Sequence, residues 1–194
     1  MSGAGPTAAR PPALTRDFYS RATPIVAREL LGQVLAVRRA DRWVGGVILE
    51  TEAYLGSGDE ASHSRRGSTP RSAVMFGPPG TAYVYLIYGV HHCFNAVTEP
   101  AGEGAAVLVR ALGPVVPTGL GVDGLATRPE RLRGPGLVCR ELGIGLALNG
   151  ADLVDGDELR IVPAQAVPAT RVVCGPRVGI SRSRELALRF RVGP

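Results

Sequence analysis

The stretch GGVILETEAYLGSGDEASH, residues 45–63, concentrates side chains that could do chemistry. Alternation in an extended strand places Glu50, Glu52 and Tyr54 on the same face as Ile48. Three further titratable side chains follow the strand: Asp59, Glu60 and His63. Carboxylates on an otherwise apolar strand are unfavourable unless their face opens onto polar surroundings. The pattern indicates either a site at the end of a strand or an edge strand with a solvated outer face.

Polar side chains also interrupt apolar strand patterns further along the chain, at Tyr85, Asn95 and Arg110. Each has an ordinary structural explanation, such as a tyrosine hydroxyl at a rim or an arginine that extends to solvent. Taken together with Glu50, Glu52 and Tyr54, they describe a cleft with one or two carboxylates, aromatic faces and a cation. Such a cleft suits a flat ring that carries hydrogen-bonding groups on its edges.

The segment YVYLIYGVHH, residues 83–92, is the second informative feature. Tyr88 stands at a strand end beside Gly89, where it can project as a wedge into stacked bases. The alternative is packing in the core, which we expect for Tyr83. The histidines do not have the i, i+4 spacing of a helical metal site, so no metal site is predicted.

The expected elements are a helix from residue 23 to 32, with Thr23 as its N-cap and Pro24 at its first position, and a second helix over 137–142. Strands are expected over 33–37, 43–54, 81–88, 93–98, 105–112, 157–162, 171–174, 177–180 and 188–192. Residues 113–124 are expected to form a flexible, glycine-rich loop. These elements predict one α+β domain over residues 13–194, after a flexible leader at 1–12. Its core is a curved, mainly antiparallel, open-barrel-like β-sheet with a few peripheral helices.

Composition indicates an acidic partner. The chain of 194 residues has a net charge of +5 and an isoelectric point near 9.6, which favours nucleic acid, although an arginine-rich composition alone could produce it. All 22 basic residues are arginine, so no side chain can form a Schiff base with a sugar. The three cysteines form no C-x-x-C pair and are expected to be reduced. No apolar run is long enough to span a membrane, and a cytoplasmic location is expected.

Four motifs carry a family resemblance: GGVILETEAYLGSGDEASHS, RGSTPR, MFGPPGTAYVYLIYGVHHCFNAV and GAAVLVRALGP. From about Leu14 to Val192 the chain resembles the alkyladenine (3-methyladenine) DNA glycosylase family. The resemblance implies a monomeric, monofunctional DNA repair enzyme without metal or cofactor. Such an enzyme flips an alkylated purine, and in some cases a deaminated one, out of double-stranded DNA. It then hydrolyses the N-glycosidic bond and leaves an abasic site.

The resemblance also implies roles for single residues. Glu52 matches the general base that activates water, and Arg110 matches a residue near that water and the DNA backbone. The walls that sandwich and read the flipped base are matched by Tyr54, His63 and Tyr85. Asn95 matches the residue that discriminates against the exocyclic amine of guanine. Tyr88 matches the wedge, with His91 on the same turn.

Departures from the family pattern keep two other functions open. Leu137 replaces a lysine that commonly contacts DNA, and the chain ends soon after residue 192. A non-catalytic nucleic-acid-binding domain of the same fold is therefore one alternative. A hydrolase of small molecules or carbohydrates is the other, with Glu50 and Glu52 about 6–7 Å apart on one strand face as paired acids.

Overall fold

The computed structural model of the chain describes residues 9–125 and 132–193. The leader expected at residues 1–12 lies mostly outside the described residues. Its last residues contact the domain: Pro11 is buried, and its carbonyl accepts a hydrogen bond from the Arg160 guanidinium at 3.3 Å. Within the described residues, no helix is long and apolar enough to cross a membrane.

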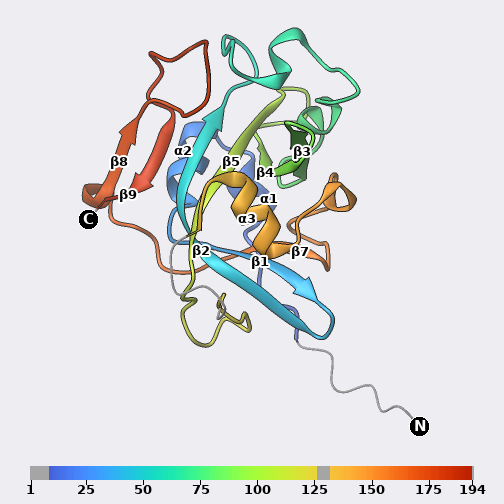
Figure 1. The fold of residues 1–194 in the computed structure, drawn as a ribbon, viewed down its shortest axis with the longest axis vertical. Coiled ribbons are helices and arrows are strands. Elements are labelled where there is room, and N and C mark those ends of the chain that lie inside the picture. The colour runs from blue at the N-terminus through green and yellow to red at the C-terminus, as the bar shows by residue number, and fades with distance from the viewer. Residues whose placement is uncertain (1–8, 126–131, 194) are drawn as a thin grey trace.

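Runs of strands are separated by short helices along the chain (Figure 1). The α-helices are α1 (Arg16–Tyr19), α2 (Thr23–Glu29) and α3 (Pro135–Leu142). The strands are β1 (Val34–Arg39), β2 (Arg42–Tyr54), β3 (Ala82–Ile87), β4 (His91–Thr98), β5 (Ala105–Gly113), β6 (Leu132–Arg133), β7 (Leu159–Val162), β8 (Val172–Gly175) and β9 (Arg189–Val192). Four 3₁₀ turns are described: η1 (His63–Arg66), η2 (Ala73–Phe76), η3 (Leu146–Leu148) and η4 (Ala169–Arg171).

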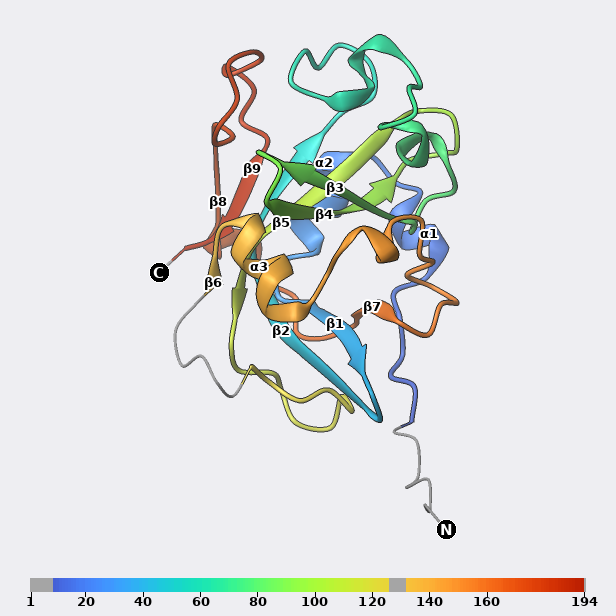
Figure 2. The same cartoon turned by 45° about the vertical axis from the view of Figure 1, so that its right-hand side comes forward.

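The strands form one curled sheet whose paired strands run antiparallel, a half-barrel in the order β3-β4-β5-β2-β1-β7 (Figures 1 and 2). Strand β6 pairs with β5, and β9 pairs with both β2 and β8. Strand β2 is central because it pairs with β1 near its start and with β5 and β9 toward its end. This arrangement confirms the predicted α+β fold on a curved antiparallel sheet.

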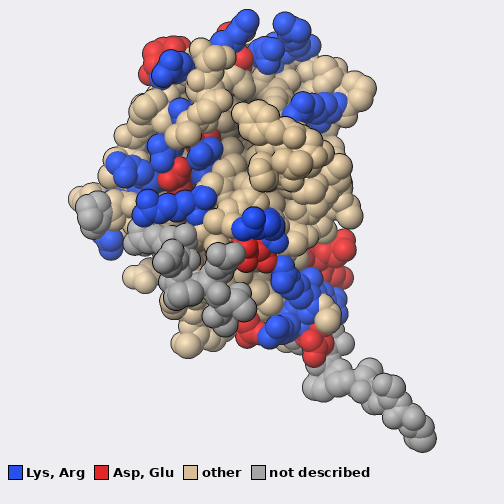
Figure 3. Space-filling view, viewed as in Figure 1, with Lys and Arg blue, Asp and Glu red and all other residues tan. Residues whose placement is uncertain are grey.

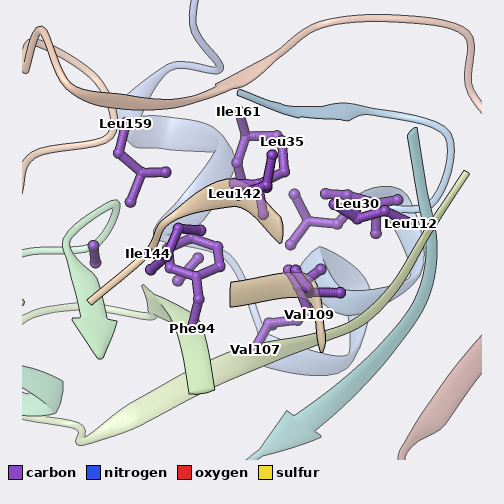
Figure 4. Close-up of a cluster of buried hydrophobic side chains, with 14 of the residues drawn as sticks. Leu30, Leu35, Phe94, Val107, Val109, Leu112, Leu142, Ile144, Leu159 and Ile161 are labelled. Carbon is purple, nitrogen blue, oxygen red and sulfur yellow. The ribbon is translucent and has the colours of Figure 1, made fainter. Parts of the chain in front are cut away.

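One face of β2, β5, β4 and β3 packs on the main hydrophobic core. This face presents Ala53, Val107, Val109, Phe94 and Val84, and α2 and α3 cover it with Val26, Ala27, Val138 and Leu142 (Figure 4). Because side chains alternate along a strand, the residues between these point to the opposite face. That opposite face carries the polar and aromatic side chains of the candidate site.

Alternation fails at one position in β2. The pairing of β2 with β5 shifts register on both sides of Glu50. Ile48 therefore lies in the core with Ala53, and the Thr51 hydroxyl donates to the Ala27 carbonyl at 2.7 Å. The prediction that Ile48 shares a face with Glu52 is wrong, because a β-bulge between them changes the parity of the strand.

Three further predictions need correction. Helix α2 begins at Thr23 but is not capped by it, since the Thr23 hydroxyl contacts the Glu99 carboxylate and the Thr98 hydroxyl instead. Residues 177–180, expected as a strand, form an irregular loop. The segment expected as a flexible loop packs against the domain: three of its side chains contact the small cluster around Trp43, namely Val116, Leu120 and Val122.

Candidate active site

Strand register places four side chains in a row across the sheet. Tyr83 of β3 pairs with Asn95 of β4, Asn95 with Leu108 of β5, and Leu108 with Glu52 of β2. Neighbouring strands lie about 4.8 Å apart, so the row spans roughly 14 Å, wide enough for a purine. Arg110, two residues after Leu108, extends the same face beside Glu52.

Glu52 is completely buried, and its carboxylate has three polar partners. Oε1 accepts the backbone N–H of Val178 at 2.8 Å, and Oε2 accepts the Tyr54 hydroxyl at 3.0 Å. The Arg110 Nε lies 3.3 Å from Oε1. Burial raises the pKa of Glu52 above its ordinary value, although the Arg110 charge and the two hydrogen bonds act in the opposite direction. The carboxylate is thus held in place and made more basic than an exposed one.

A cavity of about 440 Å³ opens directly above these contacts. Glu52 does not line it, but the three residues that contact Glu52 all do: Tyr54, Arg110 and Val178. Four of the predicted site residues also line it: His63, Tyr85, Tyr88 and Asn95. A carboxylate therefore lies immediately behind the wall of a cavity large enough for a flat ring.

The predicted aromatic walls contact one another. The rings of His63 and Tyr85 lie 4.5 Å apart at 70°, and those of Tyr83 and Tyr85 lie 5.3 Å apart. His63 Nδ1 forms a hydrogen bond with the Tyr83 hydroxyl at 2.9 Å. Burial, together with the charges of Arg71 and Arg65, lowers the pKa of His63 to about 4. The imidazole is neutral at neutral pH and presents a polar edge without a charge.

Asn95 and Cys93 form the floor between the tyrosines. The Asn95 amide nitrogen donates to the Tyr83 carbonyl at 3.0 Å, which fixes the orientation of the buried side chain. Cys93, paired with Tyr85 across the hairpin, lines the same cavity, and burial raises the pKa of its thiol. Its residue type alone gave no sign of this position.

The turn between β3 and β4 protrudes from the molecule beside the cavity. Tyr88 is 85% exposed and has a φ of 53°, a left-handed conformation that is uncommon for a bulky residue. This agrees with the predicted outward projection. His91 is exposed too but does not line the cavity; it packs against Gly136 at the start of α3. Leu137, which replaces the expected lysine, packs against the main core.

Glu50 does not face the cavity. Its Oε1 accepts hydrogen bonds from Arg189 Nε at 2.8 Å and from Arg110 Nε at 3.1 Å. Although burial favours its neutral form, these two arginines lower the pKa of Glu50. The two glutamates contact the same arginine, but Glu50 does not line this cavity and its carboxylate is held by Arg110 and Arg189, so the geometry does not favour a pair of acids acting on one ligand.

A buried ion pair that no sequence pattern predicted holds the site together. Arg177 donates to both oxygens of Asp59, at 2.5 and 2.7 Å, and to the Ala53 carbonyl at 2.9 Å. Its guanidinium also stacks 4.7 Å from the centre of the Tyr54 ring. The pair fixes the loop that carries Val178 onto the segment that carries His63. Because the two partners are 118 residues apart in the sequence, no local pattern could have revealed it.

Comparison with known proteins agrees with this geometry. The family model described as methylpurine-DNA glycosylase (MPG) matches residues 17–193. A relative from Myxococcus xanthus is 48% identical over 86% of this chain and 81% of its own length. A relative from Anaeromyxobacter dehalogenans is 49% identical over 91% of this chain and 79% of its own length. A relative from Methanocella arvoryzae is 44% identical over 92% of this chain and 90% of its own length. All three carry the name "Putative 3-methyladenine DNA glycosylase". The chain therefore belongs to the methylpurine-DNA glycosylase family.

Proposed function

We propose that this chain is a DNA repair glycosylase that extrudes an alkylated purine from duplex DNA and hydrolyses its N-glycosidic bond. One observation carries the proposal: a buried carboxylate held against the wall of an aromatic cavity, with an exposed tyrosine beside its mouth. Family membership and the names of the relatives support the same substrate class. We propose deaminated purines as a second substrate class, because polar side chains among the lining residues can hydrogen-bond an uncharged base.

Different residues of the cavity would recognise different parts of the extruded nucleotide. Tyr54, His63 and Tyr85 would enclose the base with aromatic faces and read its edge with the hydroxyl and imidazole groups. Asn95 would discriminate against guanine by occupying the space that the exocyclic amine needs, because the hydrogen bond from its amide nitrogen to the Tyr83 carbonyl fixes the side chain. Tyr88 would fill the gap left in the base stack, with His91 supporting the turn.

Glu52 would supply the chemistry. A purine alkylated at N3 or N7 carries a positive charge and leaves without further protonation. Bond cleavage then builds positive charge on the sugar, which the ionised Glu52 would stabilise while it accepts a proton from the attacking water. Arg110 would keep the carboxylate ionised and oriented. Because the chain has no lysine, we infer simple hydrolysis without a covalent Schiff base.

The pH dependence of base release should report the environment of Glu52. Because the base must be ionised, the rate is expected to fall as pH decreases through a pKa above the ordinary glutamate value of about 4.3. Replacement of Arg110 by glutamine removes a charge that lowers this pKa, so the acidic limb should move to higher pH. Single-turnover release of 7-methylguanine, corrected for spontaneous depurination, measures both profiles. An acidic limb at or below the ordinary glutamate pKa would contradict this assignment.

Tyr88 should matter for duplex substrates and much less for unpaired ones. Removal of the wedge leaves the unstacked gap empty, so Tyr88→Ala is expected to slow excision from a paired site by roughly tenfold to a hundredfold. The same lesion in single-stranded DNA should be affected far less, because no stack has to be opened. Tyr88→Phe keeps the ring and serves as the control. A similar loss on both substrates would exclude a wedge role.

The enzymatic proposal itself is tested by incubating the protein with methylated duplex DNA and identifying the free bases. Release of 3-methyladenine or 7-methylguanine supports it, and hypoxanthine-containing duplexes extend the test to deaminated purines. If the protein binds DNA in a salt-dependent manner but releases no base from any lesion, the non-catalytic binding domain is the correct function.

A further inference from the structure

A second cavity, of about 400 Å³, lies on the other side of Arg110 from the aromatic cavity. Both cavities are lined by Arg110 and Val178, so one guanidinium and one loop separate them. We name it the arginine cavity after four of its lining residues: Arg110, Arg133, Arg189 and Arg191. It lies where β9 pairs with β2, with Arg191 opposite Glu50 and Arg189 opposite Glu52.

The charges in the arginine cavity are not balanced. Glu50 is its acidic lining residue, and both hydrogen bonds to this carboxylate come from Arg110 and Arg189. Among the described residues, neither Arg133 nor Arg191 has an ion pair, and both are exposed. Basic side chains accordingly gather between β9 and α3, around acidic ones, on the face shown in Figure 3. Within the part of the chain that the structure describes, the cavity therefore presents two guanidinium groups without an ion-pair partner.

We propose that the arginine cavity binds one backbone phosphate adjacent to the extruded nucleotide, through Arg133 and Arg191. The proposal rests on the proposed function, because it places the base in the aromatic cavity and the phosphate behind Arg110. In a nucleotide a single sugar separates the base from the phosphates. The two cavities share one wall, so a base in one and its neighbouring phosphate in the other lie at a compatible separation. Guanidinium groups match phosphate oxygens in geometry and charge. Glu50 holds Arg110 and Arg189 apart from this ligand and leaves the exposed pair to bind it.

The arrangement predicts that a single phosphate interacts with two arginines. We would measure binding to a duplex that contains a tetrahydrofuran abasic-site analogue, while one phosphate at a time near the analogue is replaced by a neutral methylphosphonate. Wild type should lose roughly tenfold in affinity at one phosphate. Arg191→Gln and Arg133→Gln should each bind the unmodified duplex about that much more weakly and be insensitive to methylphosphonate at that same position. The slope of log affinity against log salt concentration should also be shallower for each variant, by the amount expected for about one fewer neutralised phosphate.

Arg38→Gln is the matched control. Arg38 is exposed and pairs with Trp43, seven residues before Glu50 in β2, about 23 Å along the strand. This variant should retain the methylphosphonate sensitivity of wild type at every position.

Two results would overturn the proposal. One is that Arg191→Gln and Arg133→Gln remain as sensitive as wild type to every methylphosphonate. The other is that free inorganic phosphate binds the arginine cavity as tightly as the duplex does, which would indicate a site for a free anion. Because the abasic analogue has no base to release, these measurements do not depend on catalysis. A protein that shows the phosphate signature but releases no base would contradict the proposed glycosylase activity and support the arginine cavity.

Discussion

Glu52→Gln is expected to lower single-turnover base release by about 10²–10⁴-fold, the range typical for loss of a positioned general base. Glutamine has nearly the same shape, and its amide oxygen can still accept the Val178 N–H that Glu52 accepts at 2.8 Å. What it loses is the negative charge beside Arg110 and the ability to take a proton. Release of 7-methylguanine from duplex DNA, with enzyme in excess, measures the effect on the chemical step alone.

The stability of the variant distinguishes a catalytic defect from misfolding. Since burial raises the pKa of Glu52, the folded state disfavours the ionised carboxylate, and a neutral isostere should not destabilise the protein at neutral pH. Urea unfolding is therefore expected to show Glu52→Gln at least as stable as wild type. Glu29→Gln, on the exposed Arg21–Glu29 pair of α2, is the control and should retain full activity.

Glu50→Gln separates the two carboxylate mechanisms. A pair of acids acting on one ligand requires Glu50 and Glu52 equally, so both variants would lose activity to a similar degree. In the mechanism proposed here Glu50 only positions Arg110 and Arg189. Glu50→Gln should therefore lose much less activity than Glu52→Gln. Equal losses of activity in Glu50→Gln and Glu52→Gln would contradict the assignment of Glu52 as the single general base. Equal base release by wild type and Glu52→Gln would remove Glu52 from the mechanism.

Local pattern was sufficient for the part of the site that lies on regular strands. Period-two alternation correctly placed Glu52 with Tyr54, and the two side chains share a hydrogen bond. The sheet itself followed from β-prone runs separated by glycine and proline turns. In these segments side-chain direction depends only on neighbours in the sequence, and this is why the prediction succeeded.

Long-range contacts determine the two features that sequence pattern did not predict, the bulge in β2 and the loop over residues 177–180. The bulge at Glu50 depends on the register of β5, and it moved Ile48 into the core. Residues 177–180 alternate like a strand, but Pro176 has no N–H to donate and Gly179 has a φ of 77°. The loop conformation is fixed instead by the contact of Arg177 with Asp59. Val178 thereby donates its N–H to Glu52, a contact with the proposed general base that is made by the backbone and does not depend on side-chain type.

Asp59→Ala should be the most destabilising single substitution at the site. Asp59 and Arg177 both have side chains without any solvent exposure, so removal of the carboxylate leaves a buried cation without its partner. Loss of one member of such a pair costs about 3–5 kcal/mol, a large share of the roughly 5–15 kcal/mol that stabilises a domain. Asp59 also accepts the N–H groups of Leu55 and Ala61, which would lose their acceptor. Urea unfolding measures the change.

The neighbouring acid provides a matched control for that experiment. Glu60 pairs with Arg182 at 3.0 Å, but both side chains are about 60% exposed, so Glu60→Ala should change the free energy of unfolding by less than about 1 kcal/mol. Similar losses for the two alanine variants would show that burial does not determine the contribution of Asp59.

A double variant separates the structural contribution of the pair from its functional one. Asp59→Leu with Arg177→Met replaces two buried charges by apolar groups of similar size, which removes the unpaired cation that Asp59→Ala leaves. The double variant should therefore regain part of the lost stability, while Leu55 and Ala61 still lack their acceptor. Base release should nevertheless stay low. Without Arg177 the loop loses the ion pair that fixes the Val178 N–H on Glu52, and the Tyr54 ring loses the guanidinium that stacks on it. A stable double variant with wild-type single-turnover rates would mean that the ion pair serves the fold alone and that Glu52 is oriented by Arg110 and Tyr54 without the loop.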